Sequence, residues 1–153
     1  MRTLILASLV ALAACGGDES IGPVEQQQDV RGDYVGTWTF SLEWNGEPGA
    51  RDDCAGFVSI DTLAGATLSG RIGIYQGGGN CNEWSKDMTG TIQPDGSFSF
   101  TLDESMLGDC ELVSGSESFI GSTDGTELDL DLEFTERCSA TLRRDYHFSG
   151  VRS

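Results

Sequence analysis

The sequence predicts an all-β fold, an eight-stranded antiparallel barrel with up-and-down order. From residue 34 onward, apolar and polar residues alternate with a period of two, which is the pattern of half-buried strands. Short turn signals such as Pro94-Asp95-Gly96 separate the alternating runs, and we find no convincing helical period. Closing such a meander into a barrel removes both sheet edges. A two-sheet β-sandwich uses the same alternation and remains the alternative fold.

Three strands have the clearest alternation, and five more are inferred from weaker runs. The first covers residues 34–44, the seventh contains Leu128, Leu130, Leu132 and Phe134 on one face, and the last runs from about Cys138 to Phe148. The weaker runs lie at residues 56–63, 67–75, 85–92, 97–102 and 111–120. Together they give eight strands joined by short connections.

Strand parity predicts different connections at the two ends of this barrel. Successive antiparallel strands run in opposite directions, so every turn that joins an even-numbered strand to the next strand lies at the end where Tyr34 enters. The tight turns at residues 64–65, 95–96 and 124–125 are all of this kind. The longer connections predicted at residues 45–53, 76–83 and 103–109 then lie at the opposite end. Loops on a rigid scaffold commonly carry binding, so this second end is the expected functional one.

Four cysteines lie in the predicted barrel, and an even count in an exported chain predicts two disulfides. Pairing between sequence neighbours favours Cys54–Cys81 and Cys110–Cys138. The alternative pairs Cys81 with Cys110 and Cys54 with Cys138. The chain has no Cys-x-x-Cys motif and a single histidine, so the sequence predicts neither a metal site nor a cofactor.

The amino-terminal residues have the pattern of an export signal. One basic residue precedes the uncharged residues 4–14, a run too short to span a bilayer. The tetrapeptide Leu12-Ala13-Ala14-Cys15 resembles the lipobox of bacterial lipoproteins. The resemblance implies removal of a signal peptide at residues 1–14 and acylation of Cys15, which would anchor the chain in the bacterial cell envelope. In the lipoproteins that this motif resembles, an Asp after the cysteine favours the inner membrane. Gly16 stands there in this chain, so the resemblance implies the outer membrane if the organism has one.

Residues 15–32 are polar, rich in Gly and Gln, and predict a flexible tether before a barrel domain at residues 33–153. The chain has 25 Asp and Glu against 9 Lys and Arg, with a formal net charge of −16. Nucleic acids require basic contacts, so this balance argues against a nucleic-acid partner. The same negative charge is compatible with a basic protein partner.

The first strand also carries a family resemblance. Gly36-Thr37-Trp38 resembles the Gly-x-Trp motif of the lipocalins. The resemblance implies that Trp38 closes one end of the barrel and that Arg144, on the apolar face of the last strand, packs across it. It favours the barrel over the sandwich.

Three functions fit this plan, and none is enzymatic, because the sequence lacks Gly-x-Ser-x-Gly, a Ser/His/Asp set and a metal-ligand cluster. The first is binding of a small apolar ligand, for which the candidate residues are Trp38, Phe40, Arg144 and Tyr146. Alternatively, these side chains, with Phe98, Phe100 and Phe148, simply fill the core.

The second function is binding of a basic enzyme, in the manner of lipoproteins that inhibit lysozyme or a protease. The candidate contact residues are the acidic Asp52, Asp53 and Asp109 in the predicted loop end. The third is a passive role in the envelope with no specific ligand.

Overall fold

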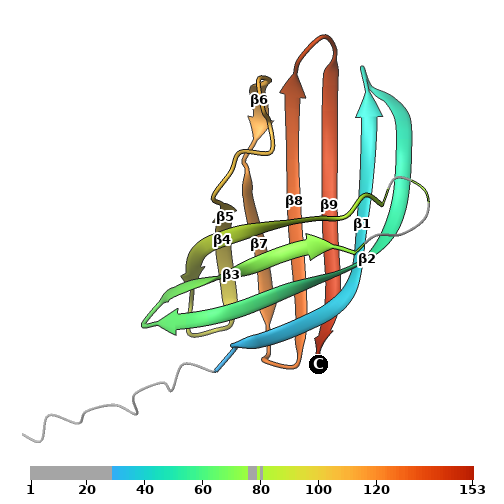
Figure 1. The fold of residues 1–153 in the computed structure, drawn as a ribbon. Helices are drawn as coiled ribbons and strands as arrows, with labels where there is room; N and C mark the ends of the chain where they lie inside the picture. Colours follow the sequence, from blue (N-terminus) through green and yellow to red (C-terminus); the bar gives the residue numbers. More distant parts are fainter. Residues whose placement is uncertain (1–28, 76–78, 80) are drawn as a thin grey trace, which may run out of the picture.

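The computed structural model describes residues 29–75, 79 and 81–153, which form one sheet of nine strands (Figure 1). The strands are β1 (Gly32–Trp44), β2 (Glu47–Ala64), β3 (Thr67–Ile74), β4 (Trp84–Ile92), β5 (Ser97–Leu102), β6 (Glu111–Gly115), β7 (Ser118–Thr123), β8 (Glu127–Arg137) and β9 (Thr141–Arg152). Within these residues, no helix has the length and apolar character needed to cross a membrane.

The sheet closes on itself as the predicted eight-stranded barrel. All pairings are antiparallel, and β9 pairs both with β8 and with β1, which joins the two ends of the sheet. β6 and β7 pair with the same side of β8, at Phe134–Arg137 and Leu128–Asp131 respectively, so together they fill one barrel position. The eight positions follow one another in sequence order. The barrel prediction is therefore confirmed, and the sandwich alternative is wrong.

The sixth predicted strand, at residues 111–120, is interrupted in the structure. Gly115 adopts a φ of +83°, which L-residues with side chains rarely take, and the chain leaves the sheet there before β7 begins. Glu117 lies in the break, and its carboxylate accepts hydrogen bonds from the backbone N–H groups of Met106 (2.6 Å) and Leu107 (3.2 Å). The break thus holds the β5–β6 connection in place.

The predicted loop at residues 45–53 is wrong, because β1 and β2 continue as a long hairpin. Asn45 and Gly46 have φ values of 51° and 84°, the left-handed pair that a two-residue hairpin turn requires. β2 consequently begins at Glu47, and Cys54 lies inside the strand instead of opening it. At the other boundary, β9 begins at Thr141, so Cys138 lies in the turn before it.

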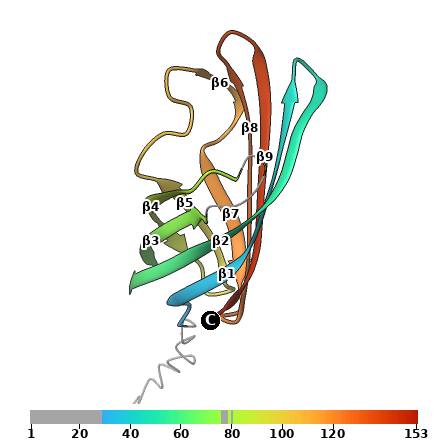
Figure 2. The same ribbon diagram turned by 45° about the vertical axis from the view of Figure 1, so that its right-hand side comes forward.

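The two ends of the barrel differ in the way that parity predicted, except that the β1–β2 connection is a tight turn. One end, which we call the closed end, holds the start of β1, the turns β2–β3, β4–β5 and β7–β8, and the carboxyl terminus at Ser153 (Figure 1). The other, which we call the open end, holds the β1–β2 and β8–β9 turns and the β3–β4 and β5–β6 connections. There the two long hairpins rise beyond β3, β4 and β5, as the rotated view shows (Figure 2).

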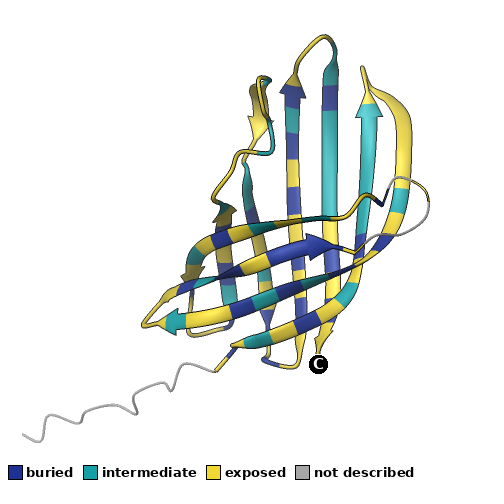
Figure 3. Ribbon diagram, in the orientation of Figure 1, coloured by how far each residue is buried: buried dark blue, intermediate teal, exposed yellow. Residues whose placement is uncertain are grey.

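The fully buried residues of β1 lie toward the closed end, and the upper parts of β1 and β9 are mostly of intermediate burial, whereas β8 has buried residues along its whole length (Figure 3). Trp38 is completely buried, and its ring centroid lies 4.9 Å from that of Phe148 and 5.7 Å from that of Phe119. Phe119 stacks in turn on Phe100 at 5.0 Å. Aromatic side chains therefore fill the barrel interior at this level.

Candidate functional site

A groove at the open end is the candidate functional site. Its volume is about 330 Å³, near the lower limit of ligand pockets, which typically span ~300–1,000 Å³. It forms where β1, β2 and β9 extend past the ends of the shorter strands. We call it the open-end groove, and its larger lining residues are Phe40, Leu42, Ile74, Trp84, Arg144 and Tyr146. Ser41, Ala50 and Asn82 complete the lining.

Three of the four ligand-binding candidates lie together in this groove. Phe40 and Tyr146 are cross-strand partners on β1 and β9, with ring centroids 6.3 Å apart. Arg144 precedes Tyr146 by two residues on the same face of β9. All three side chains are partly exposed, so a bound molecule could reach them.

The fourth candidate, Trp38, lies beneath the groove and does not line it. Its indole Nε1 donates a hydrogen bond to the carbonyl oxygen of Gly73 at 3.1 Å. Trp84, which does line the groove and is partly exposed, lies near the buried Trp38, with ring centroids 6.5 Å apart. Trp38 therefore belongs to the floor that separates the groove from the filled core.

Glycine at position 56 makes this floor possible. A Cβ there would lie 2.3 Å from Cδ1 of Trp38 and 2.4 Å from the carbonyl oxygen of Gly73. Gly56 thus leaves no space for a ligand at this level, because the Trp38 indole occupies the space beside it. At Gly70, a Cβ would lie 1.8 Å from the carbonyl oxygen of Ser59, so glycine there permits close approach of neighbouring strands.

Arg144 does not take the position that the lipocalin resemblance implies. Its guanidinium binds Glu136 of β8, with Nε 2.7 Å and Nη2 2.6 Å from the same oxygen, Oε1. The Glu136 side chain is 1% exposed, whereas that of Arg144 is 34% exposed. Burial would lower the pKa of Arg144, but the hydrogen bond to Glu136 and the interaction with Tyr146 raise the pKa above its usual value. The guanidinium is therefore charged at every physiological pH.

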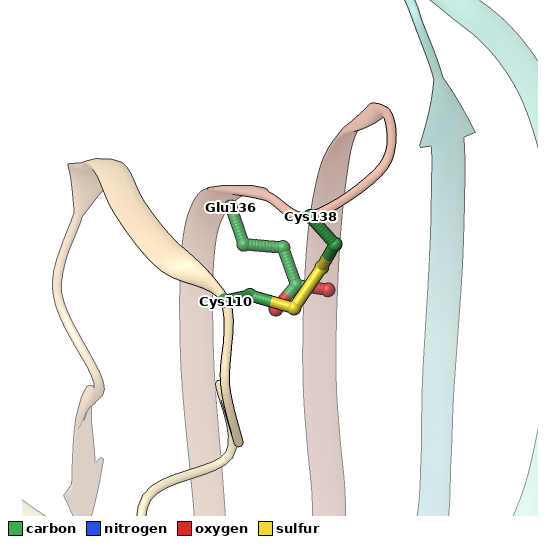
Figure 4. A group of neighbouring side chains, drawn as sticks. All are labelled: Cys110, Glu136 and Cys138. Atoms are coloured by element: carbon green, nitrogen blue, oxygen red, sulfur yellow. A yellow bond between two sulfur atoms is a disulfide. The ribbon is translucent and has the colours of Figure 1, made fainter.

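Glu136 lies next to the disulfide between Cys110 and Cys138 (Figure 4). The donor atoms of these three residues lie within 4.8 Å of one another, a spacing that a metal ion could span. However, the two sulfur atoms are bonded to each other and are not thiolates, which are the form of cysteine that ligates zinc. The carboxylate oxygen Oε2 of Glu136 is buried with no hydrogen-bond partner among the described residues.

The structure contains two disulfides, in the neighbour pairing that the sequence favours. Cys54–Cys81 attaches the β3–β4 connection to β2, and Cys110–Cys138 attaches the β5–β6 connection to the β8–β9 turn. The first is buried, with its cysteines 1% and 6% exposed, whereas Cys138 of the second is exposed. Both connections that border the open end are thus fixed covalently. Two disulfides in one domain indicate an oxidising environment outside the cytoplasm.

The three acidic partner-binding candidates do not share one surface. Asp52 and Asp53 are consecutive residues of β2, so their side chains point to opposite faces of the sheet. The Asp53 carboxylate accepts a hydrogen bond from the Thr39 hydroxyl at 2.7 Å on the outer face. Asp109 lies separately, in the β5–β6 connection.

The acylation candidate Cys15 lies outside the described residues. Three residues of the site, Glu136, Ile74 and Trp84, were not predicted from the sequence. Glu136 continues the alternating row of Leu132 and Phe134, so parity alone could have placed it inside the barrel. Ile74 and Trp84 carry no such signal, because they line the groove only through the position at which β3 ends and β4 begins.

No protein-family model matches the chain, and no curated protein matches it. Among solved structures, it is similar to a redesigned β-barrel, with 12% identity, a TM-score of 0.39, and coverage of 76% of this chain and 89% of that one. It is also similar to a structural-genomics protein of unknown function from Bacteroides ovatus, with 12% identity and a TM-score of 0.43 over 79% of this chain and 41% of that one. Likenesses of this strength assign neither a family nor a function, so the β-barrel fold itself rests on the strand pairing described above.

Proposed function

We propose that the chain is a lipid-anchored binding protein of the bacterial envelope, and that its open-end groove takes a small apolar ligand. The observation that carries the proposal is the groove itself, in which aromatic and aliphatic side chains remain partly exposed above a filled core. Concave apolar sites with a few polar groups are the usual form of small-molecule sites. The role is binding and not catalysis.

Intrinsic fluorescence tests this proposal, because Trp84 lines the groove. Trp44 is 50% exposed at the hairpin tip, so a Trp44→Phe background removes a solvent-exposed contribution to the signal. Titration with decan-1-ol should shift the tryptophan emission and saturate. Tyr146→Ala should weaken binding about tenfold, since a buried aromatic contact contributes roughly 1–2 kcal/mol.

The matched control is His147→Ala. His147 is the next residue of β9 and is exposed, with its Nδ1 2.8 Å from Asp131 on the outer wall. This variant should bind decan-1-ol as the parent does. Failure of a panel of alcohols, alkanes and aromatic probes to bind, together with native mass spectra free of retained ligand, would overturn the proposal.

The membrane anchor has a separate test. The lipobox resemblance at residues 12–15 supports acylation of Cys15, and more than one acyl chain is what stable anchoring requires. Intact mass measurement of the membrane fraction should give a chain that starts at Cys15 and carries acyl groups, and Cys15→Ala should abolish both. A mature chain without acyl mass would refute the anchor and leave the groove proposal untouched.

A further inference from the structure

The polar groups of the open-end groove differ in charge from the rest of the chain. Acidic residues outnumber basic residues by 25 to 9 in the sequence, yet the described lining contains one cation, Arg144, and no carboxylate. Its other polar side chains that face inward are the hydroxyl of Tyr146 and the amide of Asn82, each of which can donate a hydrogen bond. The Ser41 hydroxyl instead donates to the Asp145 carboxylate at 3.2 Å on the outer face. The groove therefore offers a positive charge and hydrogen-bond donors beside an apolar surface, and the nearest inward carboxylate of β2 is Asp52, the cross-strand partner of Phe40.

Glu136 fixes the orientation of that positive charge. Nε and Nη2 of Arg144 both contact one buried oxygen of Glu136, so the guanidinium is held from the protein side. A guanidinium has five N–H donors, and this contact leaves further donors on a side chain that is one-third exposed. On the same inner face of the sheet, Leu42 of β1 and Phe134 of β8 lie opposite Arg144. Charge-assisted hydrogen bonds are stronger in such a partly desolvated site than in open water.

We propose that the ligand of the groove is an apolar molecule with a single carboxylate, which binds Arg144 while its apolar part packs on Phe40, Ile74 and Trp84. This inference rests on the proposed function and adds the chemical class of the ligand. The volume of about 330 Å³ suits a medium-sized molecule, since a ~150 Å³ cavity already holds a benzene. A multiply charged anion fits less well, because Glu136 offsets the charge of Arg144 and the whole chain is strongly negative.

The test compares decanoate with decan-1-ol at about pH 7, where the free acid is ionised. The two probes share a chain and differ only in the head group. Decanoate should bind about tenfold more tightly than the alcohol, the ratio that one additional charge-assisted hydrogen bond gives. Raising the salt concentration should reduce this preference, whereas binding of the alcohol should not weaken.

Two variants assign the preference to the pair of residues. Arg144→Gln alone would leave a buried carboxylate unpaired and could unfold the protein, so the informative variant is Arg144→Gln combined with Glu136→Gln. This double variant should bind both probes equally. Glu136→Gln alone keeps a hydrogen-bond acceptor for Arg144 but removes its counter-charge, and it should increase the preference for decanoate.

The outcomes separate this inference from the proposed function. Equal binding of decanoate and decan-1-ol to the parent protein, or a preference that survives in the double variant, overturns the carboxylate assignment and leaves the apolar groove standing. Failure of both probes, with the wider panel, overturns the proposed function itself.

Discussion

Replacement of Gly56 by Ala should destabilise the protein because it removes the space that Trp38 occupies. The added Cβ would lie 2.3 Å from Cδ1 of the indole and 2.7 Å from its Nε1. It would also lie 2.4 Å from the carbonyl oxygen of Gly73, the atom that accepts the indole hydrogen bond. No single movement of the indole relieves both contacts, since one of them is with backbone.

The size of the effect follows from these contacts. Overpacking of a filled core costs about 1–3 kcal/mol. Loss of the hydrogen bond between Trp38 and Gly73 adds about 1 kcal/mol. The free energy of unfolding should therefore fall by about 2–4 kcal/mol. At the urea dependence typical of a domain of this size, the unfolding midpoint should fall by ~1–2 M.

Urea unfolding followed by far-ultraviolet circular dichroism measures this change. Ala55→Ser is the matched control, because Ala55 is the exposed neighbour of Gly56 on β2, and it should change stability by less than about 0.5 kcal/mol. Combining Gly56→Ala with Trp38→Phe should cost less than the sum of the two single changes, because the smaller ring vacates part of the contested space. A Gly56→Ala variant with the parent midpoint would refute the filled core and with it the floor of the groove.

Three further predictions concern other parts of the fold. Thiol mapping under mild reduction should find the Cys110–Cys138 disulfide reduced before the buried Cys54–Cys81 disulfide. Replacing both Cys110 and Cys138 by Ser should lower the free energy of unfolding in urea by about 3–4 kcal/mol, given their sequence separation of 28 residues. Asp124→Asn should flatten the pH dependence of stability between about pH 4 and pH 2. Hydrogen bonds from the side chain of Thr126 and from the backbone N–H groups of Glu127 and Thr126 lower the pKa of the Asp124 carboxyl to about 2. The stability that this carboxyl contributes is therefore present above its unfolded pKa and is lost as the pH falls through its folded pKa. Asn45→Ala should cost about 1–3 kcal/mol in the same assay, since it removes the bond from the Thr141 N–H and places a less tolerant residue at a φ of 51°.

The fold was predictable where the alternation is regular, and the errors lie where turns or tertiary contacts decide the structure. β8 follows directly from its alternating leucines, because only one face of the strand is buried. The loop predicted at residues 45–53 was wrong, although the Asn45-Gly46 pair at its start is a strong signal for a two-residue turn. The break between β6 and β7 depends on the contact of Glu117 with a distant connection, which no local pattern encodes.

The candidate site was predictable only in part, for a related reason. Parity correctly placed Phe40, Arg144 and Tyr146 on the inner face of the barrel. It does not predict the position along the barrel axis beyond which side chains no longer fill the interior. That position depends on where β3 ends at Ile74 and on how the indole of Trp38 fits over Gly56. The partner of Arg144 likewise depends on diagonal register between β8 and β9, which becomes known only once the strands are paired.

At the open end of the barrel, parts of β2 and β6 have a strand partner on one side only, so they form sheet edges although the barrel is closed elsewhere. β2 pairs with β3 only from Gly56 onward, and β6 is a short strand whose described pairing is with β8. An edge can accept a strand from another molecule, and proteins commonly block it with proline, charge or short length. The leading part of β2 carries Pro48 and Arg51, whereas β6 exposes Leu112 and Val113 and is protected chiefly by its five-residue length. The geometry that opens the groove therefore also leaves β6 as the least protected edge among the described strands, and we expect aggregation to begin there.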